Sequence, residues 1–194
     1  LVLFQGPAAM PAYSYNQVTI YDDVTLSAGA DTTLSFGAVT LSPGVSGPIW
    51  TILNAGSTQS DVGITIDSLN IQSGTSVVLS GTSVGPTVTT THELTNNGSL
   101  TVNEALLSLG GIPMGIGGTP TLIGSGDYTF TNSDLRFFGD VPETIPAATY
   151  HDLSLLGSGT YTLSASTTVM ATTTIASSAT LDLSTYRLSA IGDI

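Results

Sequence analysis

The chain has 194 residues and only two basic ones, Arg136 and Arg187, against 14 acidic residues, so its formal net charge is -12. Lysine and cysteine are absent, and charged residues make up 8% of the chain, where about 25% is usual. This composition excludes P-loop phosphate sites, Schiff-base lysines, thiol catalysis, cysteine-ligated zinc and disulfide frameworks. It also excludes nucleic-acid binding, which depends on clustered Lys and Arg.

Residues 1–10 are interpreted as an expression-tag scar with cloning residues. Residues 1–7 (LVLFQGP) resemble the recognition site of a picornaviral 3C protease with one glutamate missing, and residues 8–10 look like cloning residues behind it. Residues 1–4 form an apolar, strand-like run. Such a run becomes ordered either by pairing with a sheet edge or by a contact between molecules.

Short segments of alternating apolar and polar residues predict an all-β protein. Each segment ends at Gly, Ser-Gly, Asn-Gly or Pro, and helical periodicity is nearly absent. In chain order, the expected strands cover residues 17–21, 24–26, 33–36, 38–41, 49–53, 64–66, 69–71, 77–79, 99–102, 128–130, 135–137, 153–155, 161–163, 173–175, 181–183 and 186–188. A strand every 8 to 12 residues or so is typical of a solenoid, a sandwich or a barrel.

No segment is expected to span a membrane. Residues 105–126 are uncharged over roughly the length that a span requires. They contain Pro113, Pro120 and seven glycines, which break both a helix and an insertion signal.

Internal repeats favour a solenoid among these architectures. Residues 124–130 (GSGDYTF) match residues 157–163 (GSGTYTL) at an offset of 33, and looser copies of a small-small-polar-apolar-x-apolar element occur at residues 73–79, 97–102 and 178–183. Irregular self-similarity with a period of roughly 20 to 35 residues is typical of stacked coils, each of which buries its inward residues only against its neighbours.

Residues 145–155 (IPAATYHDLSL), continuing into residues 157–163, carry a resemblance to a known group. They resemble the strand repeats of large secreted bacterial surface proteins of the filamentous-haemagglutinin-like adhesin and S-layer-associated type. The resemblance covers about residues 96–194, and residues 11–95 match more weakly. It implies a right-handed parallel β-helix, at least for the C-terminal half, and a cell-surface or extracellular location. It carries over no catalytic residues.

The alternative fold is one or two β-sandwiches, since the long turns at residues 43–48 and 84–86 are compatible with a sandwich.

We divide the chain into residues 1–10, an N-terminal β region at 11–95 and a C-terminal β-repeat region at 96–194, with one continuous domain at 11–194 as the alternative. The strand pattern continues to Ile194 without a polar cap. We therefore expect an excised fragment or a subunit that stacks on a neighbour.

The expected function is structural or adhesive, through self-association, attachment to a surface or contact with neighbouring domains of a larger chain. The alternative is an extracellular carbohydrate-binding protein, with carbohydrate degradation a weaker candidate. No membrane-spanning role and no nucleic-acid partner are expected.

Calcium is the only cofactor that the sequence suggests. Asp22, Asp23, Asp61 and Asp67 lie mainly at turns, and extracellular repeat domains bind Ca²⁺ through such carboxylates together with carbonyl oxygens. The competing interpretation is that these aspartates form turns by hydrogen bonding to the backbone. No Asp-x-Asp-x-Asp loop is present.

Aromatic residues are the candidates for glycan or interface contacts. Trp50 could stack on a sugar, although its position in an apolar strand favours the core. Phe137 and Phe138 are adjacent, so they point to opposite faces of a strand and one of them is expected at the surface.

We do not expect an enzyme. The two histidines, His92 and His151, each precede a carboxylate, but strand neighbours point to opposite faces and neither pair forms a site by itself. Polysaccharide lyases depend on basic residues. Glycosidases need two carboxylates about 5 to 9.5 Å apart, and the only glutamates, Glu93, Glu104 and Glu143, lie in different contexts.

Overall fold

The computed structural model describes residues 2–4, 8–10, 13–28, 33–43, 47–54, 63–81, 86–110 and 122–192. These residues form 22 strands and no helix, which confirms the all-β prediction. Within this part of the chain, no helix is long and apolar enough to cross a membrane.

The largest sheet has ten strands. Nine of them are hydrogen-bonded in the order β1 (Val2–Phe4), β3 (Tyr15–Ile20), β5 (Thr33–Leu41), β7 (Gly63–Ile71), β9 (Thr87–Asn96), β11 (Leu106–Leu109), β14 (Asp134–Phe137), β17 (Asp152–Leu155) and β20 (Thr173–Ile175). The short strand β12 (Leu122–Ile123) pairs with the second half of β9, while β11 pairs with the first half. One long strand therefore corresponds to two shorter strands later in the chain.

Three further sheets complete the structure. The six-stranded sheet has the order β13 (Asp127–Thr131), β10 (Ser99–Asn103), β8 (Ser76–Ser80), β6 (Ile49–Asn54), β4 (Val24–Ala28) and β2 (Ala8–Met10). Two three-stranded sheets contain β15 (Glu143–Ile145), β18 (Thr160–Leu163) and β21 (Thr180–Asp182), and β16 (Thr149–Tyr150), β19 (Thr167–Val169) and β22 (Leu188–Ala190).

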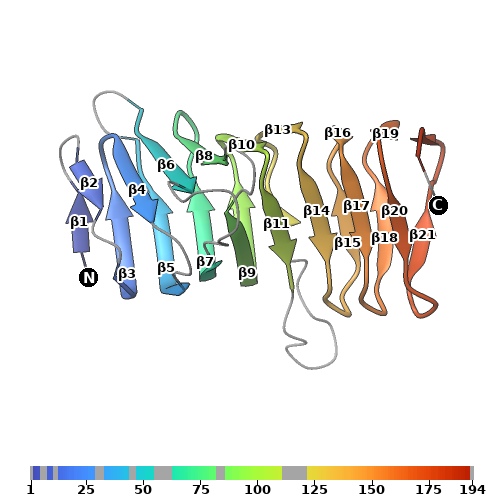
Figure 1. Cartoon of the computed structure of the whole chain (residues 1–194), viewed down its shortest axis with the longest axis horizontal. Helices are drawn as coiled ribbons and strands as arrows, with labels where there is room; N and C mark the ends of the chain where they lie inside the picture. The colour runs from blue at the N-terminus through green and yellow to red at the C-terminus, as the bar shows by residue number, and fades with distance from the viewer. Residues whose placement is uncertain are drawn as a thin grey trace.

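All the strand pairs among the described residues are parallel. The chain visits the sheets in turn and returns to each with its next strand beside the previous one, so the strands stack from β1 and β2 at one end to β21 and β22 at the other (Figure 1). Because β-sandwiches are built from antiparallel sheets, the sandwich alternative does not hold for the described strands.

The core forms because buried and partly exposed residues alternate along each strand, and because the parallel register places the buried residues of neighbouring strands beside one another. In β7, Ile64, Ile66, Leu69 and Ile71 are buried, and the residues between them are partly exposed. The register places Leu34 beside Ile64 and Leu41 beside Ile71. Like side chains therefore stack from strand to strand, and the buried residues form one continuous cluster from Val18 to Val169.

A glycine lies at the one position inside β5 that is missing from its pairing with β7, although the register is the same on both sides of it. Pairing with β7 covers residues 33–36 and 38–41 and omits Gly37. A Cβ atom on Gly37 would collide with the backbone carbonyl oxygen of Asn16. This close approach of two strands leaves room only for glycine.

Two expectations about the chain's organisation can be placed on the structure. The apolar run near the N-terminus forms β1, which pairs with β3 in the register Val2 to Val18, as the sheet-edge alternative predicts. The division expected between residues 95 and 96 falls inside β9, and the largest sheet continues across it.

Candidate functional site

The stacked ladders are interrupted at one place, which we call the seam. β12 and β13 lie on one side of the seam, and β15 and β16 lie on the other. Among the described strands, only β11 and β14 are hydrogen-bonded across it. The rings of Phe130 in β13 and Tyr150 in β16 are in contact, with centroids 4.7 Å apart. Between β13 and β16, the two sides therefore pack through side chains without a strand ladder among the described residues.

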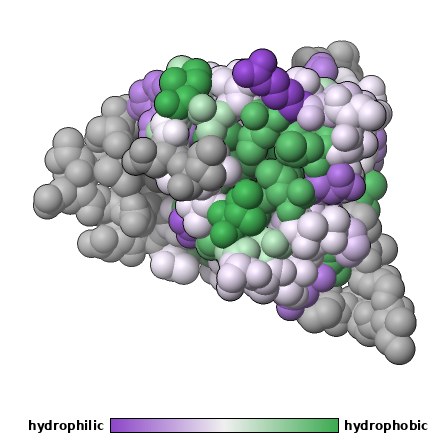
Figure 2. All heavy atoms as spheres, turned by 90° about the vertical axis from the view of Figure 1, so that its right-hand side faces the viewer, coloured by the Kyte–Doolittle hydropathy of each residue, from purple (hydrophilic) through white to green (hydrophobic). Residues whose placement is uncertain are grey.

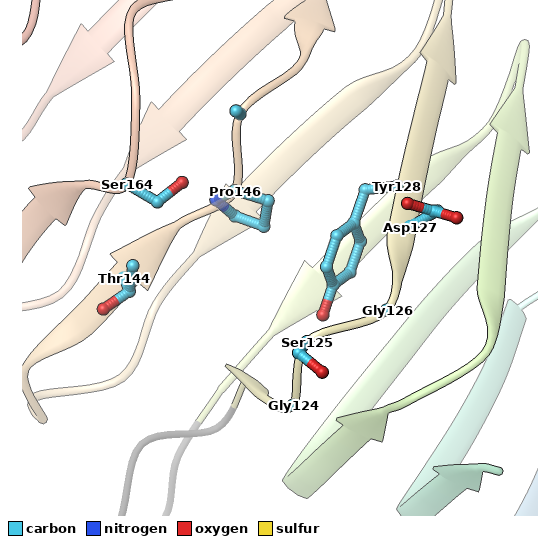
Figure 3. A pocket seen from close by; sticks show the side chains of 9 residues that line it. Gly124, Ser125, Gly126, Asp127, Tyr128, Thr144, Pro146 and Ser164 are labelled. Carbon is cyan, nitrogen blue, oxygen red and sulfur yellow. The ribbon is translucent and has the colours of Figure 1, made fainter. Parts of the chain in front are cut away.

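A cavity of about 390 Å³ opens at the seam and is the candidate binding site. Residues 124–128 line it from one side, and Thr144, Pro146, Ala147 and Ser164 line it from the other. In Figure 3 the ring of Tyr128 projects into the gap between β13 and the segment that carries Pro146.

Tyr128 occupies a core position that the seam leaves incompletely covered. It is in register with Leu100, which is fully buried, yet Tyr128 itself is only half-buried and packs on the edge of the core. Burial raises the pKa of Tyr128 to about 12, and a hydrogen bond with the Asn96 side chain opposes this only in part. The phenol is therefore neutral and remains a hydrogen-bond donor at physiological pH.

The rim of the cavity is polar. Ser125, Thr144 and Ser164 are exposed and contribute hydroxyl groups, and Asp127 contributes a carboxylate. Neither arginine lines the cavity. The site therefore offers hydroxyls, one acidic group and one aromatic ring, without a cationic group.

A second, smaller cavity of about 230 Å³ lies at the same seam between the end of β13 and the end of β16. Asn132, His151 and Met170 are among the residues that line it. His151 also belongs to a cluster of ionisable groups. Its Nδ1 lies 3.5 Å from Asp134 Oδ1 and 3.3 Å from Asp152 Oδ2.

This cluster corrects the sequence argument about His151. His151 lies between β16 and β17 and not inside a strand, so the rule that strand neighbours face opposite ways does not apply and His151 and Asp152 point together. Burial raises the pKa of Asp134, the charge of Asp152 raises it further, and His151 lowers it.

The described calcium candidates, Asp22, Asp23 and Asp67, do not form a metal-ligand group. Among the described residues, the only group of three or more His, Asp and Glu side chains with ligand atoms within 4.8 Å of one another is Asp134, His151 and Asp152. None of the four predicted aspartates belongs to it, and Asp61 lies outside the described residues. Exposed acidic groups commonly occur together without an ion, so we assign no metal to the cluster.

The predicted aspartates make local contacts instead. Asp22 Oδ1 accepts a hydrogen bond from the backbone N–H of Asp23, and Asp23 Oδ1 accepts one from the N–H of Ile49 at 3.0 Å. Asp67 contacts Thr91 and His92 on the adjacent strand. The bond of Asp22 is local, as in the turn-forming interpretation, whereas the bond of Asp23 reaches a strand 26 positions further along the chain.

The aromatic candidates separate into core and surface. Trp50 and Phe137 are buried, at 0% and 1% exposure, so neither ring is available to a glycan, and these two assignments as contact residues are wrong. Phe138 is 43% exposed, as expected for one member of the pair. Tyr128, the ring at the cavity, lies in the repeated GSGDYTF motif, and no sequence signal separates it from its fully buried counterpart Tyr161 in GSGTYTL.

The end of the stack at β20, β21 and β22 presents core positions without a cover. Ile175 is in register with Leu155, which is completely buried, but Ile175 is 39% exposed. Leu183, Tyr186 and Ile191 are exposed on the same terminal segment. Figure 2 shows hydrophobic side chains gathered on this end, surrounded by more polar residues.

Comparisons with known proteins find no match for this chain among protein-family models, curated proteins or solved structures.

Proposed function

We propose that the chain is a right-handed parallel β-helix that serves as a structural or adhesive module outside the cell, and that such modules associate end to end. The β-helix assignment is supported by the parallel pairing of every described strand pair and by the return of the chain to each sheet in sequence order. The right hand is supported by the general preference of parallel crossover connections, about 98% of which are right-handed.

The observation that carries the proposal is the uncovered apolar end. Inside the stack, each inward side chain is buried by the equivalent residue of the next strand, as Leu155 is by Ile175. At the end, Ile175 has no such neighbour among the described residues, and Leu181 and Leu188 are only partly buried against the core. Covering these side chains removes apolar surface from water, which favours association by about 25 cal/mol per Å².

The strands at the end of each sheet add hydrogen-bonding groups that could pair with a strand of a second molecule. β20, β21 and β22 each end their sheets, so one side of each strand has no strand partner among the described residues. A strand edge is a template for pairing with another chain. At the opposite end, β1 and β2 of the same chain cover the edges of β3 and β4 as parallel strands.

The occupant of the apolar end is a second copy of this chain, stacked head to tail. A head-to-tail contact joins two different surfaces and therefore produces open chains of molecules, which suits a structural role. Charged residues make up only 8% of the chain, but the net charge of -12 opposes the approach of two copies, so burial of the apolar end has to outweigh this repulsion. The extracellular location is supported by the resemblance of residues 145–163 to bacterial surface repeats.

The test is sedimentation velocity of the chain across a wide concentration range. We expect the wild-type chain to form oligomers larger than a dimer. A variant with both Leu183→Asp and Ile191→Asp should sediment as a monomer, because it places charges on the apolar end.

Leu156→Asp is the matched control. Leu156 is as exposed as Leu183, at 41% each, but it follows β17 within the stack and not at its end. This variant should associate like the wild type. A wild-type chain that is monomeric at all concentrations, or a double variant that associates as strongly as the wild type, contradicts the proposal.

A further inference from the structure

We propose that the 390 Å³ cavity at the seam binds a neutral saccharide, with the Tyr128 ring as its stacking surface. This inference is independent of end-to-end association, because the cavity lies between β13 and β15 and not on the apolar end.

The apolar wall of the cavity matches one face of a sugar ring. A pyranose carries C–H groups on its faces and hydroxyl groups around its edge. Tyr128 offers a half-buried aromatic ring, and Pro146 lines the opposite side of the cavity. Aromatic rings supply rigid contact area at small conformational cost, and tyrosine adds a polar tip.

The polar rim matches the edge of the sugar. Ser125, Thr144 and Ser164 each carry a hydroxyl, which both donates and accepts hydrogen bonds. Asp127 adds an acceptor. Sugar hydroxyls are also donors and acceptors, so a saccharide can pair with every member of this set, whereas a purely apolar ligand would leave the rim unpaired.

The charge of the site excludes anionic sugars. No arginine lines the cavity and the chain has no lysine, while Asp127 and the net charge of -12 repel an anion. The Tyr128 phenol is neutral at physiological pH and adds no charge of its own. A uronic acid, a sialic acid or a phosphosugar therefore has no partner for its negative charge.

The size of the cavity limits the ligand to a short saccharide. Ligand pockets in proteins have volumes of about 300 to 1,000 Å³, and this cavity lies near the lower bound. A mono- or disaccharide fits this volume. A longer saccharide could place only a short part of its length inside the cavity.

The test is saturation-transfer NMR of the full chain with glucose, galactose, mannose, rhamnose and N-acetylglucosamine, each alone. Glucuronic acid serves as the charged counterpart of glucose. We expect saturation transfer to at least one neutral sugar, weaker or no transfer to glucuronic acid, and at least a tenfold loss of affinity for that sugar in Tyr128→Ala.

Two further variants separate binding from folding. Ala147→Met changes an exposed residue of the cavity wall and fills the cavity with a flexible, non-aromatic side chain, so it should abolish binding while leaving the circular dichroism spectrum and melting temperature unchanged. Tyr13→Ala removes an exposed tyrosine that does not line the cavity, and it should bind like the wild type.

The absence of transfer to all five neutral sugars overturns the proposal. Equal binding of glucuronic acid and glucose overturns it as well, as does unchanged binding in Ala147→Met. None of these results bears on sedimentation of the wild-type chain, so this proposal and the proposed function fail separately.

Discussion

Asp134 and Asp152 occupy directly opposed positions on the adjacent parallel strands β14 and β17. Like charges placed opposite each other destabilise a sheet. His151 lies within 3.5 Å of one oxygen of each carboxylate and compensates in part. The pKa of Asp134 is nevertheless raised, with burial as the largest cause and the charge of Asp152 as the second.

Asp134→Asn is therefore expected to stabilise the protein at neutral pH. The substitution keeps the shape of the side chain and removes one of two opposed charges. Because Asp134 is 42% exposed, the gain should lie near the lower end of the range for cross-strand pairs, at about 0.2 to 0.3 kcal/mol. Chemical denaturation measured by circular dichroism provides the check, and a loss of stability would contradict the expectation.

The gain from Asp134→Asn should depend on pH. A carboxyl group with a raised pKa binds its proton more tightly in the folded state. Its contribution to stability is therefore complete below the ordinary value of 3.8 and is lost as the pH rises through the folded pKa. The variant and the wild type should have equal stability in acid and diverge above that range. A difference that is constant with pH would show that charge is not its origin.

Asp152→Asn removes the other charge of the opposed pair, and its effect on stability should differ from that of Asp134→Asn. Asp152 Oδ1 accepts a hydrogen bond from the backbone N–H of Thr172 at 2.6 Å, which Asp134 does not do. Replacing this carboxylate weakens a charge-assisted bond to the next turn of the chain. Asp152→Asn should therefore be less stable than Asp134→Asn in the same denaturation experiment.

Asp140→Asn should have the opposite pH dependence. Asp140 Oδ1 accepts hydrogen bonds from the backbone N–H and the hydroxyl of Ser158, which lower the pKa of Asp140. The contribution of a carboxyl group with a depressed pKa is present above the ordinary value of 3.8 and is lost as the pH falls through the folded value. The variant should melt below the wild type at neutral pH, and melting curves recorded down to strong acid should converge.

Trp50 should be essential for stability through its volume and not through its N–H group. Its side chain is completely buried and contacts Phe36 edge to face, with ring centroids 5.7 Å apart. Nε1 has no hydrogen-bond partner among the described residues. Trp50→Ala should cost about 3 to 5 kcal/mol by leaving a cavity. Trp50→Phe should cost much less, because it removes the unsatisfied donor and keeps a ring; equal losses would contradict this account.

Tyr150→Phe and Tyr161→Phe should each destabilise the protein. The buried hydroxyl of Tyr150 donates to the Pro146 carbonyl at 2.7 Å, and that of Tyr161 donates to the Gly139 carbonyl at 2.8 Å. Removing either hydroxyl takes a hydrogen bond from a buried carbonyl, at a cost of about 1 to 2 kcal/mol. The exposed Tyr186 is the control, and Tyr186→Phe should leave the melting temperature unchanged.

Local sequence patterns predicted most of the strands, because inward and outward residues alternate in a strand whose two faces meet core and water. β8 and β10 follow such patterns closely. β9 was missed, although its ten residues make it the longest strand. Its Thr-rich segment around His92 has few apolar residues, and Thr90 is buried at an inward position where the pattern predicts an aliphatic side chain. Thr is β-branched and fits a strand, but it gives little hydrophobic contrast.

The candidate sites could not be predicted in the same way. Asp134 and Asp152 lie 18 positions apart in sequence, and only the register of β14 on β17 makes them neighbours. The cavity likewise depends on which strands pair. Tyr128 and Tyr161 occupy equivalent places in the two copies of the repeat, yet Tyr161 is covered and Tyr128 is open at the seam.

The sequence by itself determined that this protein is made of β-strands and that it is rich in hydroxyl side chains, with few charged residues and only two basic ones. These properties depend on residue type and on spacing over a few residues, so they can be read locally. The tertiary structure alone decided that the strands pair in parallel, that the ladders break at the seam, and that Ile175 is exposed at a core position among the described residues. Those properties depend on contacts between residues 18 or more positions apart, and the register that makes the contacts is set by packing of the whole stack.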